Sequence, residues 1–378
     1  MGLVGGGPGS FIGRIHRIAA ELDGEAELVC GAFSSDPQRS REAGEAYHID
    51  PARAYASYAQ MFEAEKALPA DKRMDFVAVV TPNHLHFEPA RLALENGFHA
   101  VVDKPLCFSL DEARALQTAV DRSRRILAVT YTYSGYPLVK EARALVAAGR
   151  IGAVRKIYVE YPQGWLATNL EGSGQKQASW RTDPAKSGAG GAIGDIGTHA
   201  AHLAEYVSGL RITHIDAMLN TFIPDRRLDD DSSMLLRFDS GASGVLMATQ
   251  VAVGEENNLA IRVYGEKGSI TWKQVEPNTL VLGSLDAPTQ VLRAGWGYLG
   301  AAATRNTRTP SGHPEGYLEA FANIYAAFYR AVRDHAAGKK IDPREYDFPG
   351  IADGVRGMAF INTVIRSAQS QQKWTEFA

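Results

Sequence analysis

The sequence has few cysteines, no basic excess and no long apolar run. Its 378 residues include two cysteines, Cys30 and Cys107, which lie far apart and form no CxxC pair. This excludes a disulfide framework and a cysteine-based zinc site. Lysine and arginine number 40 against 43 aspartates and glutamates, a formal charge of −3, so no broad basic surface predicts binding to nucleic acid or to an anionic membrane. No apolar stretch approaches the roughly 18 residues that a membrane span needs.

The N-terminus has none of the features of a targeting segment. Met1–Val4 leads directly into glycines, which leaves no room for a signal peptide. The same four residues are short for a first strand, which leaves open whether the natural chain extends beyond Met1. These features predict a cytoplasmic enzyme or binding protein. A length of 378 residues predicts two domains, each able to bury its own core.

The first third of the chain alternates short apolar runs with amphipathic stretches, which predicts parallel strands joined by helices in a doubly wound sheet. Ser109 and Glu112 have the spacing of a capping box and predict a helix that runs toward Arg124. The predicted strands lack the alternation of a half-exposed sheet and are therefore buried on both faces. They are Leu3–Val4, Ala26–Phe33, Phe76–Val80, His99–Val102 and Ile126–Tyr131.

Beyond residue 132 the pattern changes to strands joined by short turns, after a helix over Pro137–Ala148. Connections this short predict antiparallel pairing, with one wet and one packed face. Helices over Phe321–Val332 and Val355–Ala368 are expected to cover the packed face. Gly164–Gly191 is a long polar loop of the kind that usually serves function. The predicted strands are Val154–Tyr161, Ile212–Thr221, Ser233–Phe238, Gly244–Val251, Leu259–Tyr264 and Ser269–Lys273.

A glycine-rich loop follows the first strand and opens the first helix. Gly7, Gly9 and Gly13 give a GxGxxxG spacing in place of a strict GxGxxG. Glycines in this context allow a tight turn and bring backbone amides close to a pyrophosphate. The alternative is a flexible turn without a ligand. The residues that we expect to contact a dinucleotide are Gly5, Gly7, Gly9, Ser10, Phe11 and Ile12.

The end of the second strand should decide between NAD and NADP. The position that usually holds an acid for the ribose has Ser34 and Ser35, and Arg39 follows on the next helix. Serine with arginine could accept a 2′-phosphate. Alternatively, Ser35 or Asp36 caps the helix and the arginine faces water. The sequence leaves the choice of NAD or NADP open.

Polar residues also follow the third strand, where a parallel sheet exposes its carboxyl ends to ligands. Thr81, Pro82, Asn83 and His86 are therefore expected at the cofactor, although Asn83 could equally cap a helix. The pair His84 and His86 lacks a carboxylate or cysteine partner, so we expect no metal. The next strand ends in Asp103-Lys104-Pro105, and Asp103 and Lys104 are also expected at the cofactor. An ammonium at this point could donate to a substrate oxygen, and the proline could fix the turn through a cis peptide bond.

The last group is Asp195 and His199, which are four residues apart and share a face if the segment is helical. A carboxylate that orients an imidazole makes a general base near neutral pH. The alternative is a helix N-terminal acid beside a buried structural histidine. Gly190 and Gly191 cost helix stability, and a closely approaching ligand would explain them.

Together these motifs, in this order, resemble the glucose–fructose oxidoreductase / inositol dehydrogenase / rhizopine catabolism (Gfo/Idh/MocA) family from Leu3 to about Trp374. One departure is Asp103, where the family usually has glutamate. The resemblance implies an α/β protein with an N-terminal Rossmann domain, residues 1–132. An α+β domain, residues 133–378, would carry a large open, mainly antiparallel sheet, with the junction near 131–135.

The resemblance also implies roles for the residues. Lys104, Asp195 and His199 match catalytic positions, and Trp180-Arg181 reaches toward the cofactor, NAD or NADP. Members oxidise or reduce sugars and cyclitols and commonly form homodimers or homotetramers through the sheet. We therefore expect hydride transfer at a secondary alcohol carbon of a small polyhydroxylated substrate. The alternatives are a redox-assisted glycoside hydrolase and a non-catalytic sensor of the same fold. Expected substrate contacts are Lys104, Tyr133, Gln163, Trp165, Asp195, His199 and His313.

Overall fold

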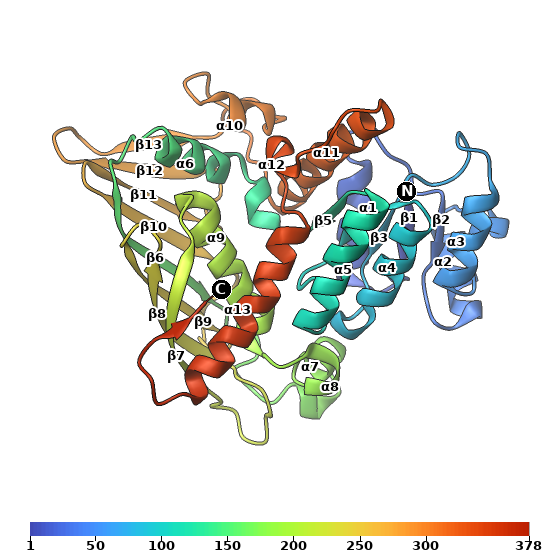
Figure 1. Ribbon diagram of the computed structural model, residues 1–378, viewed down its shortest axis with the longest axis horizontal. Helices are drawn as coiled ribbons and strands as arrows, with labels where there is room; N and C mark the ends of the chain where they lie inside the picture. Colours follow the sequence, from blue (N-terminus) through green and yellow to red (C-terminus); the bar gives the residue numbers. More distant parts are fainter. Residues whose placement is uncertain (378) are drawn as a thin grey trace. The chain divides into compact units, whose positions relative to one another are not determined.

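A computed structural model describes residues 1–377, without the side chains of residues 343 and 344. The chain forms two compact units (Figure 1). The first comprises Met1–Thr132 together with Phe321–Val355, and the second comprises Tyr133–Ala320 together with the chain from Arg356 onward. A C-terminal segment therefore returns to the N-terminal unit.

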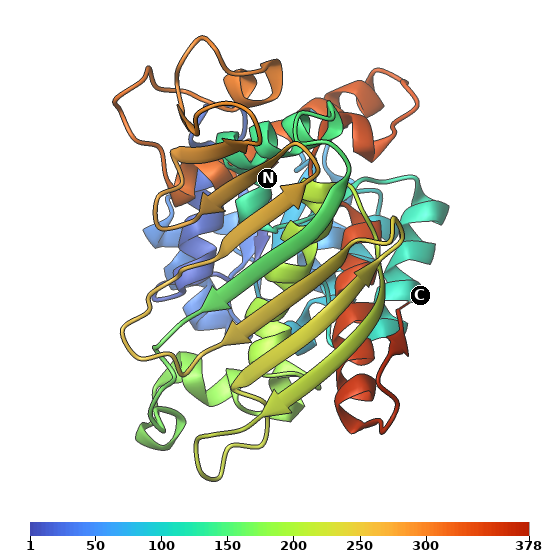
Figure 2. The same ribbon diagram turned by 90° about the vertical axis from the view of Figure 1, so that its left-hand side faces the viewer.

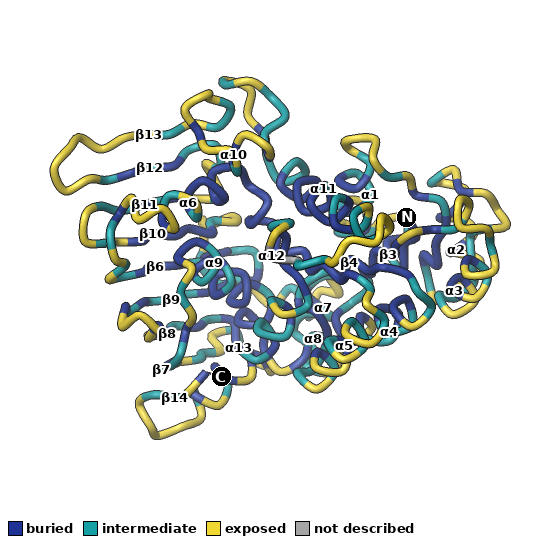
Figure 3. Tube along the Cα trace, turned by 45° about the horizontal axis from the view of Figure 1, so that its top comes forward, coloured by how far each residue is buried: buried dark blue, intermediate teal, exposed yellow. Residues whose placement is uncertain are grey.

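The first unit contains a five-stranded parallel sheet with the order β2-β1-β3-β4-β5. All its strands are buried (Figure 3), because helices cover them, and this agrees with the continuous apolar runs in the sequence. The predicted doubly wound sheet is confirmed, although β2 is much shorter than the predicted 26–33. The strands are β1 (Gly2–Val4), β2 (Cys30–Ala32), β3 (Phe76–Val79), β4 (His99–Val102) and β5 (Leu127–Val129).

Helices α1, α2, α3 and α5 of this unit begin with a side-chain cap. At α5, the Ser109 side chain accepts from Glu112 N, and the Glu112 carboxylate accepts from Phe108 N. The helices are α1 (Phe11–Glu21), α2 (Pro37–Ala46), α3 (Tyr58–Ala67), α4 (Phe87–Glu95), α5 (Leu110–Ser123), α11 (Tyr317–Ala336) and α12 (Pro343–Tyr346), with short turns η1 (Pro51–Arg53) and η2 (Asn83–Leu85).

The expectation that the helix around Phe321–Val332 covers the second sheet is wrong. This segment is part of α11, and Tyr325, Phe328 and Tyr329 pack their rings around Phe76 of β3, with centroids 5.2–6.2 Å apart. Aromatic pairs at these separations contribute beyond their buried area. The helix is therefore a component of the N-terminal core.

The second unit contains a nine-stranded sheet with the order β13-β12-β11-β10-β6-β9-β8-β7-β14. Its pairs are antiparallel except β6 with β9, which are parallel. The predicted open, mainly antiparallel sheet is confirmed, but β12, β13 and β14 were not predicted. The strands are β6 (Val154–Pro162), β7 (Ile212–Asn220), β8 (Asp231–Phe238), β9 (Ser243–Thr249), β10 (Ala260–Gly265), β11 (Gly268–Lys273), β12 (Thr279–Ser284), β13 (Gln290–Arg293) and β14 (Thr375–Glu376).

One face of this sheet is packed and the other is open (Figure 2). Burial alternates along β8, so that Met234 and Leu236 are buried whereas Leu235 is exposed. Helices lie against the packed face, and α9 contacts β6, β9 and β10. The other helices of the unit are α6 (Pro137–Ala147), α7 (Lys176–Arg181), α8 (Pro184–Ser187), α9 (Thr198–Ser208), α10 (Ala301–Arg305) and α13 (Ile351–Gln369), with η3 (Thr132–Gly135), η4 (Glu171–Ser173) and the π-helix η5 (Ile193–Gly197).

Candidate active site

The glycine-rich loop of the first unit has the geometry of a dinucleotide cradle. Gly5, Gly6 and Gly9 have φ values of 82°, 75° and 84°, a left-handed region that side chains rarely adopt. A Cβ on Gly13 would lie 2.3 Å from Gly6 Cα, so glycine is required where α1 packs on the loop. Ser10 caps α1 by accepting from Gly13 N at 3.2 Å, and Phe11 is exposed at the helix start. Backbone amides at a helix N-terminus suit a pyrophosphate, so these residues fit the cofactor.

At the end of β2, the alternative that Asp36 caps the next helix is the one observed. Its carboxylate accepts from Gln38 N at 2.8 Å and from Arg39 N at 3.3 Å. Ser34 Oγ accepts from Asp36 N at 3.2 Å. Ser35 and the Arg39 side chain are exposed. The turn after β2 therefore presents a carboxylate as well as the serines and the arginine.

The loop after β3 is tied to the turn that carries Lys104. His86 is buried, and its ring nitrogens lie 2.9 Å from Pro105 O and 2.7 Å from Thr81 O. Burial lowers the pKa of His86, although Asp103 and both carbonyl oxygens act in the opposite direction. Asn83 is buried at the start of η2, which follows Pro82, and His86 occupies the cap position of α4. His86 is therefore a structural link between two loops at the same sheet edge.

The Asp103-Lys104-Pro105 turn follows β4 and contains a cis peptide bond before the proline. Asp103 accepts from Thr130 Oγ1 at 2.8 Å and lies 3.8 Å from His16 Nε2. Burial would raise the pKa of Asp103, but His16, Lys104 and His86 together lower it well below its usual range. The carboxylate is thus held ionised beside Lys104, whose side chain is half-buried.

In the second unit, Asp195 lies within the π-helix η5 and His199 in the first turn of α9. The predicted α-helix is therefore a π-helix at this point, a form that often occurs at functional sites. Packing within the chain already requires the two glycines before it. A Cβ on Gly191 would lie 2.0 Å from Asp229 O, and one on Gly190 would lie 2.6 Å from Ile193 Cγ2.

The Asp195 carboxylate is held by side chains from two other segments. Gln250, directly after β9, donates from Nε2 to Asp195 Oδ2 at 2.8 Å, and Arg181 Nε lies 3.3 Å from the same oxygen. The amide of the buried Gln250 also donates to Gln163 Oε1 at 3.3 Å. Sequence reasoning missed Gln250, because the segment was interpreted as the continuation of a strand to Val251. Its position directly after a strand was the available signal.

His199 is buried among aromatic rings. Its ring centroid lies 5.4 Å from that of Tyr133 and 5.9 Å from that of Tyr161, both in edge-to-face arrangements. His202 stacks on Tyr206 with centroids 5.7 Å apart. Burial raises the pKa of Tyr161 to about 12, so this phenol stays neutral at physiological pH.

Amide and indole groups continue from Asp195 through the second unit. Trp165 Nε1 donates to Gln163 Oε1 at 3.0 Å, and Gln163 Nε2 donates to Asn257 Oδ1 at 2.5 Å. The Arg181 guanidinium lies over the Trp180 ring at 4.2 Å and over Trp165 at 5.9 Å. The structure therefore brings together Gln163, Trp165, Trp180, Arg181 and Asp195, all of which the sequence had singled out.

His313 is the last of the expected substrate contacts. It is exposed on the loop after α10, and the buried Glu315 orders that loop by accepting from Thr309 N at 2.6 Å. The polar contacts of the described residues do not connect His313 with Asp195. Among residues 1–377, no three His, Cys, Asp or Glu side chains are grouped so that they could hold a metal ion. No helix in this part of the chain is long and apolar enough to cross a membrane.

Comparison with known proteins gives matches over nearly the whole chain. The model of the oxidoreductase family with an NAD-binding Rossmann fold matches residues 1–131, and that of the GFO/IDH/MocA C-terminal domain matches residues 139–271. The chain is 32% identical to the Bacillus subtilis oxidoreductase YfiI, covering 99% of this chain and 96% of the relative. It is 27% identical to levoglucosan dehydrogenase of Pseudarthrobacter phenanthrenivorans, covering 100% and 97%.

Solved structures of similar proteins also match nearly the whole chain. The chain superimposes on an inositol dehydrogenase homologue from Azotobacter vinelandii in complex with NAD+ with a TM-score of 0.93 and 36% identity, covering 100% of this chain and 96% of the other. The complex of an Azotobacter vinelandii inositol dehydrogenase homologue with NADH and myo-inositol gives a TM-score of 0.91 and 35% identity, covering 100% and 97%.

Proposed function

Because the chain belongs to the GFO/IDH/MocA family of NAD-binding oxidoreductases, we propose that it transfers a hydride between the nicotinamide and a secondary alcohol carbon of a sugar or cyclitol. The observation that carries the proposal is the polar group around Asp195, made of Arg181, Gln250, Gln163 and Trp165. Amides pair with hydroxyls, and an indole packs on the apolar face of a ring. Levoglucosan and myo-inositol, named for the relatives, are ligands of this chemistry.

The residue roles in this proposal follow general acid–base chemistry. His199 accepts the proton of the reacting hydroxyl, and Asp195, held by Arg181 and Gln250, orients the imidazole and stabilises its charge. Lys104 donates to the developing alkoxide. Bound NAD supplies the hydride acceptor. Tyr133 and Tyr161 exclude water from the imidazole, because they pack against its ring.

In this proposal, residues 1–132 form the domain that binds the dinucleotide, and residues 133–378 form the domain that binds the substrate. The glycine loop, with its left-handed residues and the capped start of α1, supports the first assignment. The cluster around Asp195 supports the second. Lys104 belongs to the first unit and His199 to the second.

NAD is the proposed cofactor in preference to NADP. The Asp36 carboxylate caps α2 in the turn after β2, and a negative charge at this point repels a 2′-phosphate. Arg39 acts in the opposite direction. A ratio of NADP to NAD dissociation constants above about tenfold is therefore expected, equal to roughly 1.4 kcal/mol.

A homodimer or homotetramer through the open face of the second sheet completes the proposal. Tyr158, Met218, Leu235 and Tyr264 are large apolar side chains on this face, each between 37% and 56% exposed. Exposed apolar groups that gather on one surface mark interaction sites. Light scattering of the wild-type protein and of a Leu235→Glu variant tests this assembly.

The test of the function is a thermal-shift matrix of NAD and NADP against sugars and inositols, because ligands of the native state raise its stability. We expect a shift with NAD and turnover of NAD with at least one polyol. The absence of any shift with either dinucleotide would overturn the proposal. Release of an aglycone without net NADH would instead indicate a glycoside hydrolase, and binding without turnover would indicate a sensor.

A further inference from the structure

We propose that the connection between β7 and β8, residues 221–230, is the positioning element of the active site, with Asp229 as the residue that sets the place of Asp195. This inference rests on the proposed function of Asp195. It concerns residues of the second unit only, and it explains several buried charges that the reaction itself does not use.

Asp229 binds the start of the π-helix through three consecutive backbone amides. Its carboxylate accepts from Gly191 N at 2.6 Å and from Ile193 N at 2.7 Å, and its carbonyl oxygen accepts from Ala192 N at 2.9 Å. Asp195 follows two residues later and bonds back through its own amide to Gly191 O at 2.9 Å. One residue therefore satisfies the unpaired amides that every helix start leaves.

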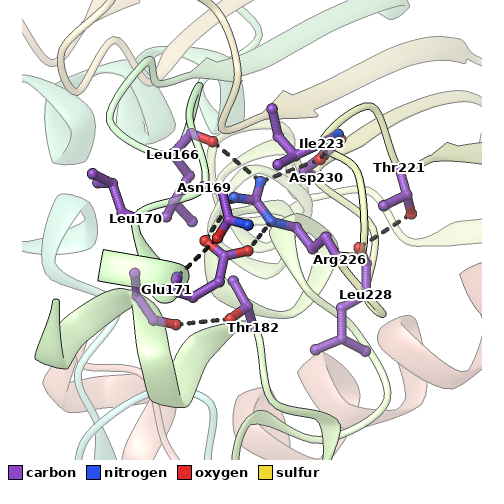
Figure 4. Close-up of polar contacts among 12 residues, drawn as sticks. Leu166, Asn169, Leu170, Glu171, Thr182, Thr221, Ile223, Arg226, Leu228 and Asp230 are labelled. Carbon is purple, nitrogen blue, oxygen red and sulfur yellow. Dashed lines mark hydrogen bonds and ion pairs between the residues drawn. The ribbon is translucent and has the colours of Figure 1, made fainter. Parts of the chain in front are cut away.

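Arg226 joins the same connection to the long loop that carries Trp165 (Figure 4). Its guanidinium donates to both Glu171 oxygens at 2.8 and 3.0 Å, to Asp230 at 3.2 Å, and to Leu166 O at 3.1 Å. The Arg226 and Asp230 side chains are each 1% exposed. Leu166 adjoins Trp165, so the contacts of Arg226 fix the backbone next to the Trp165 indole.

A third contact reaches the segment after Arg181. Arg227 donates to Asp183 Oδ1 at 2.8 Å, and Asp183 caps α8. Three neighbouring residues of one connection thus hold the π-helix, the loop at Leu166 and the start of α8. These segments carry or adjoin Asp195, Trp165 and Arg181, which form the candidate site.

The chemistry of these groups favours positioning over stability. Buried ion pairs are poor stabilisers relative to apolar side chains of the same size, because desolvation offsets their attraction. Burial also destabilises the charged form of Asp229. It raises the pKa of this carboxyl to about 6, although hydrogen bonds from the backbone amides of Gly191 and Ile193 act in the opposite direction. What these groups supply is a fixed geometry, and a displacement of about 1 Å in a catalytic group can lower turnover about a hundredfold.

The test is Asp229→Asn, which preserves shape but replaces one acceptor oxygen by an NH2 group that cannot accept from a backbone N–H. We expect kcat on the best polyol to fall about 10- to 100-fold, whereas the NADH dissociation constant changes less than about twofold. Hydrogen exchange at residues 191–197 should accelerate. Arg226→Lys should lower kcat less than Arg226→Met, because lysine keeps the positive charge but cannot donate two parallel hydrogen bonds to a carboxylate as a guanidinium does.

The control is Arg155→Gln, which removes an exposed arginine paired with Glu266 and should leave kcat and exchange unchanged. A folded Asp229→Asn protein that keeps kcat within about threefold of the wild type would overturn the inference. If the wild-type protein binds NADH but oxidises no polyol, the proposed reaction fails independently. In that case unchanged exchange at residues 191–197 in Asp229→Asn would overturn the positioning role as well.

Discussion

Replacing Gln250 by leucine removes a hydrogen-bond donor to the Asp195 carboxylate. The amide of Gln250 donates at 2.8 Å, whereas Arg181 Nε lies at 3.3 Å from the same oxygen. Gln250 is 3% exposed, so water does not readily replace the lost donor. We therefore expect Gln250→Leu to leave Asp195 less well oriented toward His199.

The magnitude follows from the type of bond. A hydrogen bond to a charged group contributes about 1.5–3 kcal/mol. Since about 1.36 kcal/mol corresponds to a tenfold change in rate, kcat should fall roughly 10- to 150-fold. The loss should appear in kcat more than in KM, because the oriented carboxylate stabilises the charge that develops on the imidazole in the transition state.

Steady-state reduction of NAD, followed at the nicotinamide absorbance, measures the effect. Gln290→Leu is the matched control, because Gln290 is an exposed glutamine on β13, and its kcat should equal that of the wild type. NADH binding should be unchanged in both variants. A Gln250→Leu protein with normal Tm and kcat within about twofold of the wild type would refute the assignment of Asp195 as the oriented carboxylate that supports His199.

The remaining predictions concern other parts of the chain. Lys104→Met and His199→Ala should each lower kcat at least about a hundredfold, measured on the same polyol; near-normal turnover in either would contradict its role. Gly13→Val should weaken NADH binding at least about tenfold, measured by fluorescence titration, because its Cβ would meet Gly6 Cα at 2.3 Å. Between pH 6 and 3, the Tm of the Glu65→Gln variant should fall less steeply than the Tm of the wild type. Burial raises the pKa of Glu65, but its bonds to Arg53 and a backbone amide lower it below its usual value, so its stabilisation is present at neutral pH and lost on acidification. If the Tm of the variant falls as steeply with acidification as that of the wild type, Glu65 does not stabilise the protein in this way.

The parallel sheet could be predicted because its strands are continuous apolar runs, with His99–Val102 matching at both ends. The outer strands β12 and β13 escaped prediction. Val291 is 52% exposed, and β13 has no buried residue, so its sequence lacks the pattern of a packed strand. The aromatic face of α11 was visible, but the sheet that it covers is set by tertiary packing across more than 200 residues of chain, as the contact of Phe328 with Phe76 shows.

Some residues of the candidate site could likewise be predicted from the sequence, and others could not. Asp195 could be singled out because it stands four residues before His199 in a glycine-rich segment, whereas Arg181 was named only because the family resemblance implied it. Gln250 was missed, since its position directly after a strand was a weak signal and its contact with Asp195 is set by tertiary packing. Gly190 and Gly191 have a cause that the sequence does not show, because a Cβ at either position would meet Ile193 or Asp229.

Deuterium tracing tests the central claim most directly. The wild-type protein is incubated with NAD and with polyols deuterated at each secondary carbinol carbon, and the NADH formed is analysed by mass spectrometry and NMR. The proposed reaction predicts deuterium at C4 of the nicotinamide for one carbon of the true substrate, and loss of this transfer in His199→Ala. Bound NAD that acquires no deuterium from any sugar or cyclitol would contradict the assignment as a dehydrogenase.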